Sequence, residues 1–225
     1  MDISVIIPTL NEAATIGETL RRLRSSGSCE VIVVDGGSDD GTPELARPQA
    51  DLVLSAGRGR ATQMNVGARA ASGQVLLFLH ADTVLPPNFP ALLEGALHNP
   101  RVVGGRFDVR LDAEGWLFRI IETLMNLRSR LSRIATGDQA IFVRSRTFLE
   151  LGGYREAELM EDLELSYRLK RRGELACLRE RVVTSARRWQ RDGIARTIGL
   201  MWLLRFLYFI GVSPNYLKTF YADTR

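Results

Sequence analysis

The stretch that decides the fold is residues 3–12, ISVIIPTLNE, in which an apolar, β-branched run passes directly into polar residues. A short run of this kind predicts a buried strand over residues 3–7. The same pattern returns further along, with apolar runs at 31–34, 52–54 and 75–79. Helical patterns at 11–27 and 60–71 lie between these runs. Strands and helices that alternate at this spacing predict an α/β fold, with a mostly parallel sheet and helices on both faces.

The second half of the sequence is less regular. An alternating stretch lies within 102–111, and two short strands are predicted at 140–143 and 182–184. Helical patterns cover 116–131 and 161–172, and the run 194–212 is strongly apolar. No internal repeat, low-complexity linker or clean boundary interrupts the chain. We therefore expect residues 1–225 to form one domain built in two halves.

The charge is divided unevenly between these halves. The 225 residues carry 30 Lys+Arg and 26 Asp+Glu, a formal net charge of +4. Residues 1–112 hold 10 basic and 13 acidic groups (−3), whereas residues 113–225 hold 20 and 13 (+7). Arginine supplies 28 of the basic groups, which suits either anion recognition or a GC-rich genome. No basic cluster interleaved with aromatic residues stands out, so no nucleic-acid partner is expected.

Composition and the N-terminus narrow the class of protein further. A content of 45% hydrophobic and 25% charged residues is that of an ordinary globular domain and excludes a fibrous or disordered chain. Cys29 and Cys177 are isolated thiols without metal-site spacing, which favours a reducing compartment. The first residues lack a basic segment, and their apolar run stops at Pro8, so they do not resemble a signal peptide. We expect a cytoplasmic protein.

Polar residues follow three of the predicted strands directly. They are residues 8–12, the Gly-rich acidic loop 35–41, and the segment 80–82. In an open parallel sheet, ligands bind beyond the carboxyl ends of the strands, so all three segments are expected on one rim. The simpler interpretation is that Asp35 caps a helix and Asp82 makes a turn. Three such segments on one rim favour a binding site.

Asp82 is the best candidate for a metal ligand. Mg²⁺ and Mn²⁺ prefer oxygen ligands and often use one or two carboxylates together with substrate phosphates. His80 faces the same side if the backbone is extended, and imidazole suits Mn²⁺ better than Mg²⁺. His80 also fits a simpler role as a hydrogen-bonded loop histidine.

Further candidates for chemistry have equally simple alternatives. The Gly-Arg loop at 57–65 either binds a phosphate at a helix N-terminus or is a solvated turn. The acidic segment 161–164 either complements a helix dipole or supplies a general base, and Asp138 would line the same cleft. The segment 185–190 either clamps a diphosphate through its paired arginines or is a loop anchored by tryptophan.

The apolar run 194–212 contains Arg196 and Arg205, so it is not a clean membrane-spanning helix. It is either a helix that packs against protein, including a second copy of the chain, or a helix that lies on a membrane surface. An exposed apolar face would distinguish the two.

Taken together, these motifs resemble the family 2 glycosyltransferases with the GT-A fold. The resemblance rests on residues 4–12, 33–42, 77–83, 137–139 and 160–162, which come in the family's order. It runs from residue 3 to about residue 189. More narrowly, residues 59–65 and 80–83 resemble a bacterial subfamily called radical-SAM/selenodomain-associated transferases.

The resemblance implies a role for each candidate residue. The nucleotide would be bound by Pro8, Thr9, Glu12, Asp35 and Arg60. Mg²⁺ or Mn²⁺ would be bound by Asp82 and His80, the latter standing where most of the wider family has Asp. The catalytic base would be Asp162. The acceptor or diphosphate side would hold Asp138, Glu161, Arg188 and Trp189.

The resemblance also implies which segments bind the nucleotide and the acceptor, and which donor is used. Residues 1–112 would form the nucleotide-binding half, 113–190 the acceptor half, and 191–225 an apolar C-terminal helix and tail. A UDP-sugar is favoured over a GDP-sugar. Residues 194–212 would meet a membrane surface, on its inner face, or a second copy of the chain.

The expected function is metal-dependent, inverting transfer of a sugar from a nucleotide-diphosphate sugar to an acceptor hydroxyl. Two other classes are less consistent with the sequence. A nucleotidyltransferase would have a Gly-rich loop with a basic residue after the first strand, and a dinucleotide oxidoreductase would have G-x-G-x-x-G there; residues 8–12 match neither. A non-catalytic nucleotide-binding protein is the remaining alternative, and His80 is its main support.

Overall fold

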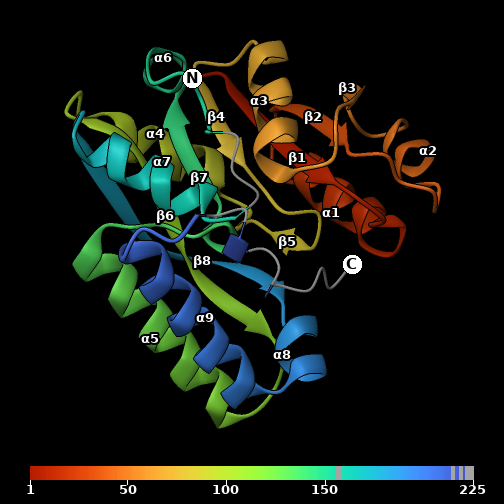
Figure 1. Ribbon diagram of the computed structural model, residues 1–225. Helices are drawn as coiled ribbons and strands as arrows, with labels where there is room; N and C mark the ends of the chain where they lie inside the picture. The colour runs from red at the N-terminus through yellow and green to blue at the C-terminus, as the bar shows by residue number, and fades with distance from the viewer. Residues whose placement is uncertain (156–158, 214–215, 218–219, 221–225) are drawn as a thin grey trace.

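The computed structural model describes residues 1–155, 159–213, 216–217 and 220. Within these ranges, eight strands form one sheet in the order β3-β2-β1-β4-β7-β6-β8-β5 (Figure 1). The strands are β1 (Ile3–Thr9), β2 (Glu30–Asp35), β3 (Leu52–Ser55), β4 (Val75–Phe78), β5 (Thr83–Val84), β6 (Val102–Asp112), β7 (Ile141–Arg144) and β8 (Glu174–Ser185). The helices are α1 (Ala13–Ser25), α2 (Thr42–Ala46), α3 (Arg60–Ala70), α4 (Phe89–Leu97), α5 (Trp116–Ser132), α6 (Ser145–Glu150), α7 (Glu161–Lys170), α8 (Arg187–Asp192) and α9 (Ile194–Phe209), with a 3-10 turn η1 at Gly137–Gln139.

The first four strands confirm the predicted parallel sheet. β1 pairs in parallel with β2 and with β4, and β2 pairs in parallel with β3. The carboxyl ends of β2, β1 and β4 are therefore neighbours. The predicted rim exists, and the segments that follow these three strands emerge along it.

Alternation along β1 explains why helices cover both faces of the sheet. Val5 and Ile7 point to one face, where they share a core cluster with residues of α1, α2 and α4. Ile6 points to the other, where it packs with residues of α3, α6 and α7. Because side chains alternate along a strand, a run of apolar residues is stable only if both faces are buried.

The second half of the sheet differs from the prediction. β7 runs antiparallel between β4 and β6, and β5 runs antiparallel to β8. β8 extends from Glu174 to Ser185, far longer than the predicted 182–184. Its first eight residues, ELACLRER, are rich in charge and at most partly buried, so they have no apolar signal. The short elements β5, α4 and α6 were not predicted either.

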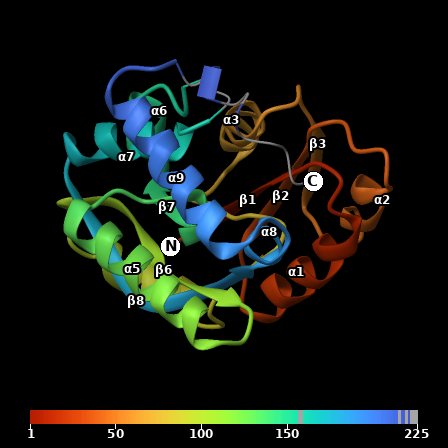
Figure 2. The same cartoon turned by 60° about the horizontal axis from the view of Figure 1, so that its bottom comes forward.

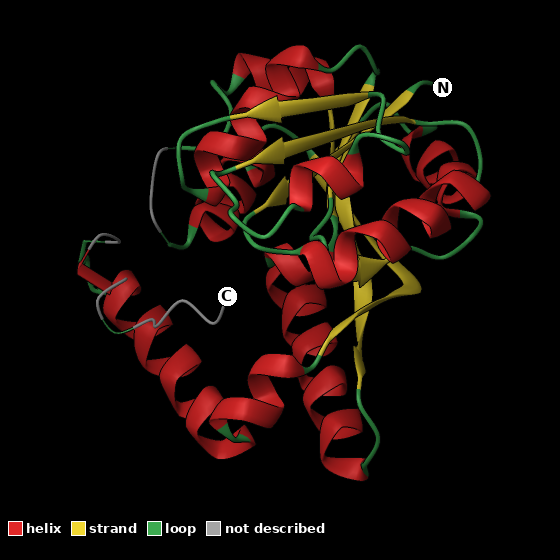
Figure 3. Cartoon of the chain, turned by 90° about the vertical axis from the view of Figure 1, so that its right-hand side faces the viewer, coloured by secondary structure: helices red, strands yellow, loops and turns green. Residues whose placement is uncertain are grey.

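The last two described helices extend away from the sheet. α8 replaces the loop expected after residue 185, and α9 ends at Phe209 rather than at 212. Figure 2 shows α9 running from α8 toward α7, and Figure 3 shows α5 and α9 diverging from their N-terminal ends. Of the expected segment 191–225, residues 214–215, 218–219 and 221–225 lie outside the described residues. Among the helices described, none has the length and apolar character needed to cross a membrane.

Candidate active site

The loop after β2 is organised by Asp35, which is 4% exposed. One Asp35 oxygen, Oδ2, accepts hydrogen bonds of 2.9 Å from the backbone N–H groups of both Gly37 and Ser38. The other, Oδ1, accepts from the hydroxyls of Ser38 at 2.5 Å and Thr9 at 3.2 Å. Thr9 is fully buried at the end of β1. Asp35 therefore holds the Gly-rich loop in place and joins it to β1, and it caps no helix.

Gln63 was not predicted, yet it ties the same region together. Its amide nitrogen donates to the backbone oxygens of Thr9 at 2.7 Å and Val34 at 2.8 Å, and its residue is 2% exposed. Because Gln63 belongs to α3, these hydrogen bonds fix the helix against the ends of β1 and β2. Pro8 is also buried, and it lies beyond Ile6, the last residue of β1 that pairs with β4. The sequence of α3, RATQMNVGARA, contains several polar residues and does not single out Gln63.

Glu12 is a buried carboxylate on this rim, with 3% of the residue exposed. Its backbone N–H donates to the hydroxyl of Thr42 at 2.9 Å. Its Oε2 accepts from the Thr15 hydroxyl at 2.9 Å and from Arg187 Nη2 at 3.2 Å. A buried carboxylate needs such partners, because an unpaired buried charge is costly.

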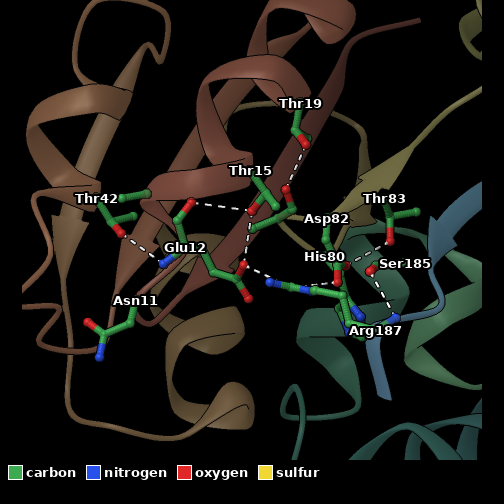
Figure 4. Close-up of polar contacts among 12 residues, drawn as sticks. Asn11, Glu12, Thr15, Thr19, Thr42, His80, Asp82, Thr83, Ser185 and Arg187 are labelled. Carbon is green, nitrogen blue, oxygen red and sulfur yellow. Dashed lines mark hydrogen bonds and ion pairs between the residues drawn. The ribbon is translucent and has the colours of Figure 1, made fainter. Parts of the chain in front are cut away.

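Arg187 joins two of the predicted site residues that are far apart in sequence. Its Nη2 donates to Glu12 Oε2 at 3.2 Å and to Asp82 Oδ2 at 2.9 Å, as Figure 4 shows. Although burial alone would lower its pKa, the hydrogen bonds and charges of Asp82 and Glu12 raise the pKa of Arg187. Arg188 and Trp189 were expected on the acceptor or diphosphate side, whereas Arg187, which was not singled out, is the arginine that contacts Glu12 and Asp82.

A small ladder holds Asp82 and Arg187 at this distance. Thr83 pairs with Thr184 where β5 meets β8, and their hydroxyls are 2.9 Å apart. Asp82 immediately precedes this pairing, and Arg187 follows it within three residues. The ladder therefore sets the separation of the two side chains.

Asp82 has the donor chemistry of a site for a hard cation. While Oδ2 faces Arg187, Oδ1 has only a long contact of 3.5 Å with the Thr83 hydroxyl. The described residues contain no group of three or more metal-ligating side chains. A single carboxylate beside a nearby imidazole nevertheless fits Mg²⁺ or Mn²⁺ if substrate phosphates complete the coordination.

His80 lies between the two sides of the site. Its Nδ1 is 3.5 Å from Asp138 Oδ1, and its ring packs on Gly137, where an added Cβ would come within 2.7 Å of Nε2. Loss of hydration alone would raise the pKa of Asp138, but the facing His80 and the charges of Arg60 and Arg188 lower it. His80 thus sits two residues from Asp82 while its side chain faces η1.

Asp162 is a shielded carboxylate whose ionisation is altered by its surroundings. It lies in the first turn of α7, its Oδ2 accepts the Gly137 N–H at 2.8 Å, and its Oδ1 accepts the Leu163 N–H at 2.7 Å. Burial, followed by the charge of Glu161, raises the pKa of Asp162 to about 6, while Arg60 and these hydrogen bonds oppose the shift. A carboxylate with a raised pKa in a confined position has the properties of a general base.

Arg60 lies on the Asp162 side rather than beside Thr9 and Asp35. Its Nε is 3.1 Å from Glu161 Oε1, and the charge of Glu161 raises the pKa of Arg60. Glu161 is 3% exposed, and its Oε2 has no hydrogen-bond partner among the described residues. The Gly-Arg loop therefore delivers its arginine to the start of α7.

Arg188 and Trp189 have less direct positions. Burial lowers the pKa of Arg188, and the charge of Asp138 opposes this shift. The Nε of Arg188 lies 3.9 Å from Asp192 Oδ2. Trp189 packs with an apolar cluster around Leu111, Ile121 and Ala186, as a tryptophan anchor would. Two groups result, one of Glu12, Asp82 and Arg187, and one of Arg60, Asp138, Glu161 and Asp162, with His80 between them.

Comparison with known sequences identifies the family. The model of the glycosyl transferase family 2 matches residues 4–152. The undecaprenyl-phosphate 4-deoxy-4-formamido-L-arabinose transferase of Aeromonas hydrophila is 32% identical over 138 residues, which cover 55% of this chain and 42% of that protein. The chain spans about half the length of the curated relatives it matches.

Comparison with solved structures identifies the fold. Staphylococcus aureus TarS 1–349, in complex with UDP-GlcNAc, matches with a TM-score of 0.66 and 19% identity, over 82% of this chain and 58% of that one. Glucosyl-3-phosphoglycerate synthase from Mycobacterium tuberculosis, in complex with Mn²⁺, UDP and glucosyl-3-phosphoglycerate, matches with a TM-score of 0.58 and 22% identity, over 80% and 70%. The expected GT-A architecture is thereby confirmed. The chain belongs to the family 2 glycosyltransferases.

Proposed function

We propose that the chain transfers a sugar from a nucleoside-diphosphate sugar, preferably a UDP-sugar, to an acceptor oxygen with inversion at the anomeric carbon. The observation that carries this proposal is the confined Asp162 carboxylate, whose pKa is raised to about 6, in the same site as the Glu12–Arg187–Asp82 group. One group suits a general base, and the other suits an anionic leaving group.

In the proposed step, the acceptor hydroxyl attacks the anomeric carbon and gives its proton to Asp162. The bond from the anomeric carbon to the diphosphate oxygen breaks, and the nucleoside diphosphate leaves. Negative charge grows on the diphosphate, where the Arg187 guanidinium is placed to stabilise it. Attack from the face opposite the leaving group produces inversion.

We propose that Asp82, with His80 nearby, holds Mg²⁺ or Mn²⁺ when a donor is bound. Such an ion supplies Lewis-acid stabilisation of the departing phosphate oxygens. The free Oδ1 of Asp82 and the Mn²⁺ in the complex of the mycobacterial synthase support this assignment. Membership of the radical-SAM/selenodomain-associated subfamily is part of the same proposal, because residues 59–65 and 80–83 carry that resemblance.

The proposed donor half is 1–112, the acceptor half 113–190, and the apolar end 191–225. In this arrangement Thr9, Asp35 and the loop that Asp35 holds would bind the base and ribose. Arg188 and Asp138 would lie toward the acceptor. The alternative activity, nucleotidyl transfer, would require a nucleoside triphosphate in place of a nucleotide sugar.

UDP should stabilise the full chain against thermal unfolding. A ligand present at 100 times its Kd adds about 2.7 kcal/mol to the free energy of unfolding. We expect UDP to raise the melting temperature more than GDP does, and more with Mn²⁺ than without. Asp35→Asn should weaken this effect, whereas Asp39→Asn, an exposed change in the same loop, should not. Differential scanning fluorimetry measures both.

Absence of any shift with UDP, GDP or their sugars would contradict the proposed function. A shift with nucleoside triphosphates alone would favour nucleotidyl transfer instead. Product analysis with a UDP-sugar and no acceptor then separates an enzyme from a binding protein, because slow hydrolysis of the donor is expected only from the enzyme.

We also propose that the chain docks on the inner face of a membrane while remaining cytoplasmic. An exposed apolar stripe on α5 consists of Trp116, Leu117, Ile120, Leu124, Leu127 and Leu131. A second on α9 and its end consists of Trp202, Leu203, Phe206, Phe209 and Ile210. Exposed apolar stripes of this extent mark an interaction surface, and the +7 charge of residues 113–225 suits anionic lipids.

The chain should bind vesicles that contain anionic lipid. We expect co-sedimentation with phosphatidylglycerol vesicles at low salt, weaker binding to phosphatidylcholine vesicles, and loss of binding in the double variant Phe206→Glu, Phe209→Glu. Leu149→Glu, an equally exposed apolar position on α6, serves as the matched control. Equal sedimentation of both variants would contradict the proposal. A dimer that the double variant abolishes would assign the stripes to a second copy instead.

A further inference from the structure

Two arginines near the candidate base lack the partners that other buried arginines have. Arg128 on α5 and Arg205 on α9 are both partly buried. Arg128 Nη2 is fully buried and has no hydrogen-bond partner within the described part of the chain. Neither guanidinium forms an ion pair with any residue that the structure describes. Among the described residues, neither positive charge is therefore paired with a carboxylate at contact distance.

Three other shielded arginines show the contrast. Arg106 pairs with Asp108, and Arg168 pairs with Glu164 at 2.5 Å. Arg130 also pairs with Asp108, at 2.5 Å. Because removing a charge from water is costly unless it is paired, most such groups have a carboxylate partner. Arg128 and Arg205 are exceptions that call for an external anion.

Their positions are set by packing around the start of α7. Leu204, which precedes Arg205, is fully buried against Met160 and Leu163, the residues that flank the Glu161–Asp162 pair. Arg128 precedes Ser129, a fully buried residue whose hydroxyl donates to the Ile134 oxygen at 2.9 Å. Both arginines are thus held by rigid helices rather than by mobile loops.

The charges near the two arginines place them on the acceptor side. Burial, followed by the positive charge of Arg205, lowers the pKa of Arg128 to about 10, and burial lowers that of Arg205. The negative charges of Asp162 and Asp138 act on both guanidinium groups and oppose this lowering of the pKa. Glu12 and Asp82, by contrast, act on Arg187. The arginines therefore share the electrostatic environment of the candidate base, not that of the proposed diphosphate site.

Asp162 is not paired directly with either of them. Both of its oxygens already accept backbone N–H groups, from Gly137 and Leu163. It also forms no ion pair within 4.0 Å of a described arginine. The two guanidinium groups consequently remain available for a ligand.

We propose that Arg128 and Arg205 bind the phosphate group of the acceptor and thereby hold the acceptor against Asp162. A phosphate monoester carries about −1.5 to −2 charges at pH 7, which matches two guanidinium groups. Guanidinium forks bind phosphate oxygens in pairs. This inference rests on the proposed glycosyl transfer and names its acceptor class, whether the phosphate belongs to a small soluble molecule or to a lipid headgroup.

The test uses the full chain saturated with UDP and Mn²⁺ and titrates two phosphate monoesters. Glycerol 3-phosphate, which carries free hydroxyls, represents a soluble source, and phosphatidylinositol 4-phosphate in detergent micelles, which carries both inositol hydroxyls and a phosphate monoester, represents a lipid source. We expect at least one of the two ligands to bind. Binding is measured by calorimetry for glycerol 3-phosphate and by fluorescence transfer for the lipid. Arg128→Gln and Arg205→Gln should each weaken that binding about 10- to 100-fold, the range for hydrogen bonds to a charged group.

Two controls make the result specific. Arg196→Gln, an exposed arginine on the same α9, should leave phosphate binding unchanged. The Kd for UDP should also be unchanged in both test variants, and their melting temperatures should not fall, because removing one of two like charges relieves repulsion.

Every other outcome contradicts either the acceptor assignment or the proposed function. If UDP binds but neither phosphate monoester does, the acceptor assignment is wrong and the proposed transfer stands. The same conclusion follows if the Gln variants bind the phosphate monoester as well as the wild type does. If the Gln variants lose UDP affinity, the two arginines belong to the donor and the assignment is also wrong. If UDP itself fails to bind, the proposed function fails first.

Discussion

Replacing Asp162 with Asn is expected to lower turnover by about 10²–10⁴-fold, the usual contribution of a general base. Asn has nearly the same shape, and its side-chain oxygen can still accept the Gly137 N–H that Asp162 Oδ2 accepts at 2.8 Å. It cannot take the acceptor's proton. We therefore expect a loss in kcat with UDP binding intact, measured by steady-state sugar transfer together with calorimetric titration of UDP.

The dependence on pH provides a second test of the same residue. Because the base must be ionised and its pKa is raised to about 6, wild-type kcat should fall about tenfold per pH unit below 6 and level off above 7. The residual activity of Asp162→Asn should lack this limb. Turnover within threefold of the wild type, or an unchanged acid limb in the variant, would remove Asp162 from the mechanism.

Stability distinguishes this outcome from simple misfolding. The folded-state pKa of Asp162 lies above its ordinary value of 3.8, so the folded state disfavours the charged form. Its ionised carboxylate therefore costs stability above pH 6, and that cost disappears as the pH falls toward 4. Asp162→Asn should consequently be at least as stable as the wild type at pH 8. A lowered melting temperature at pH 8 would instead indicate a structural defect.

Replacing Arg187 with Gln is expected to reduce kcat by about 10²–10³-fold, the range observed when one group that stabilises developing charge is removed. The change removes the cation shared by Glu12 and Asp82, at 3.2 and 2.9 Å, and leaves two carboxylates facing the departing diphosphate. The effect should exceed any change in KM, because negative charge on the leaving group grows as its bond breaks. Steady-state kinetics with a UDP-sugar measure both quantities.

Lysine at the same position and a neighbouring arginine provide the controls. Arg187→Lys keeps the charge but loses the planar fork, so it should recover part of the activity. Arg191→Gln, on the exposed side of the same α8, should be nearly neutral. If Arg187→Gln and Arg191→Gln had equal activity, Arg187 would be only a bridge between carboxylates and not part of the reaction.

The first half of the fold could be predicted because its strands are buried on both faces. Runs such as 3–7 and 75–79 have no other stable environment, and Gly and Asp residues mark where each run ends. Adjacent parallel strands then bring the segments at their carboxyl ends together without further information. The grouping of Asp35, Glu12 and Asp82 on one rim followed from this rule alone.

The rest depends on pairings that local sequence does not encode. The charged first part of β8 forms a strand because β6 lies beside it, with Val102 opposite Glu174 and Gly105 opposite Ala176. The position of Arg187 follows from the β5–β8 ladder, which brings together residues about 100 positions apart. The facing of His80 toward Asp138 depends on the close approach of Gly137. Residue types alone could suggest these side chains but not their partners.

The order of strands also has a consequence for how the protein is made. β4 gains its second neighbour only when β7 arrives, and Asp82 is fixed only when β8, near residue 184, reaches β5. During synthesis from the N-terminus, the nucleotide loops can form early on β1 and β2. The proposed donor site, however, stays incomplete until Arg187 has left the ribosome. A nascent chain stalled at residue 112 would present an unpaired β4 edge and would lack Arg187, so the proposed donor site would not yet hold the group expected to stabilise the diphosphate.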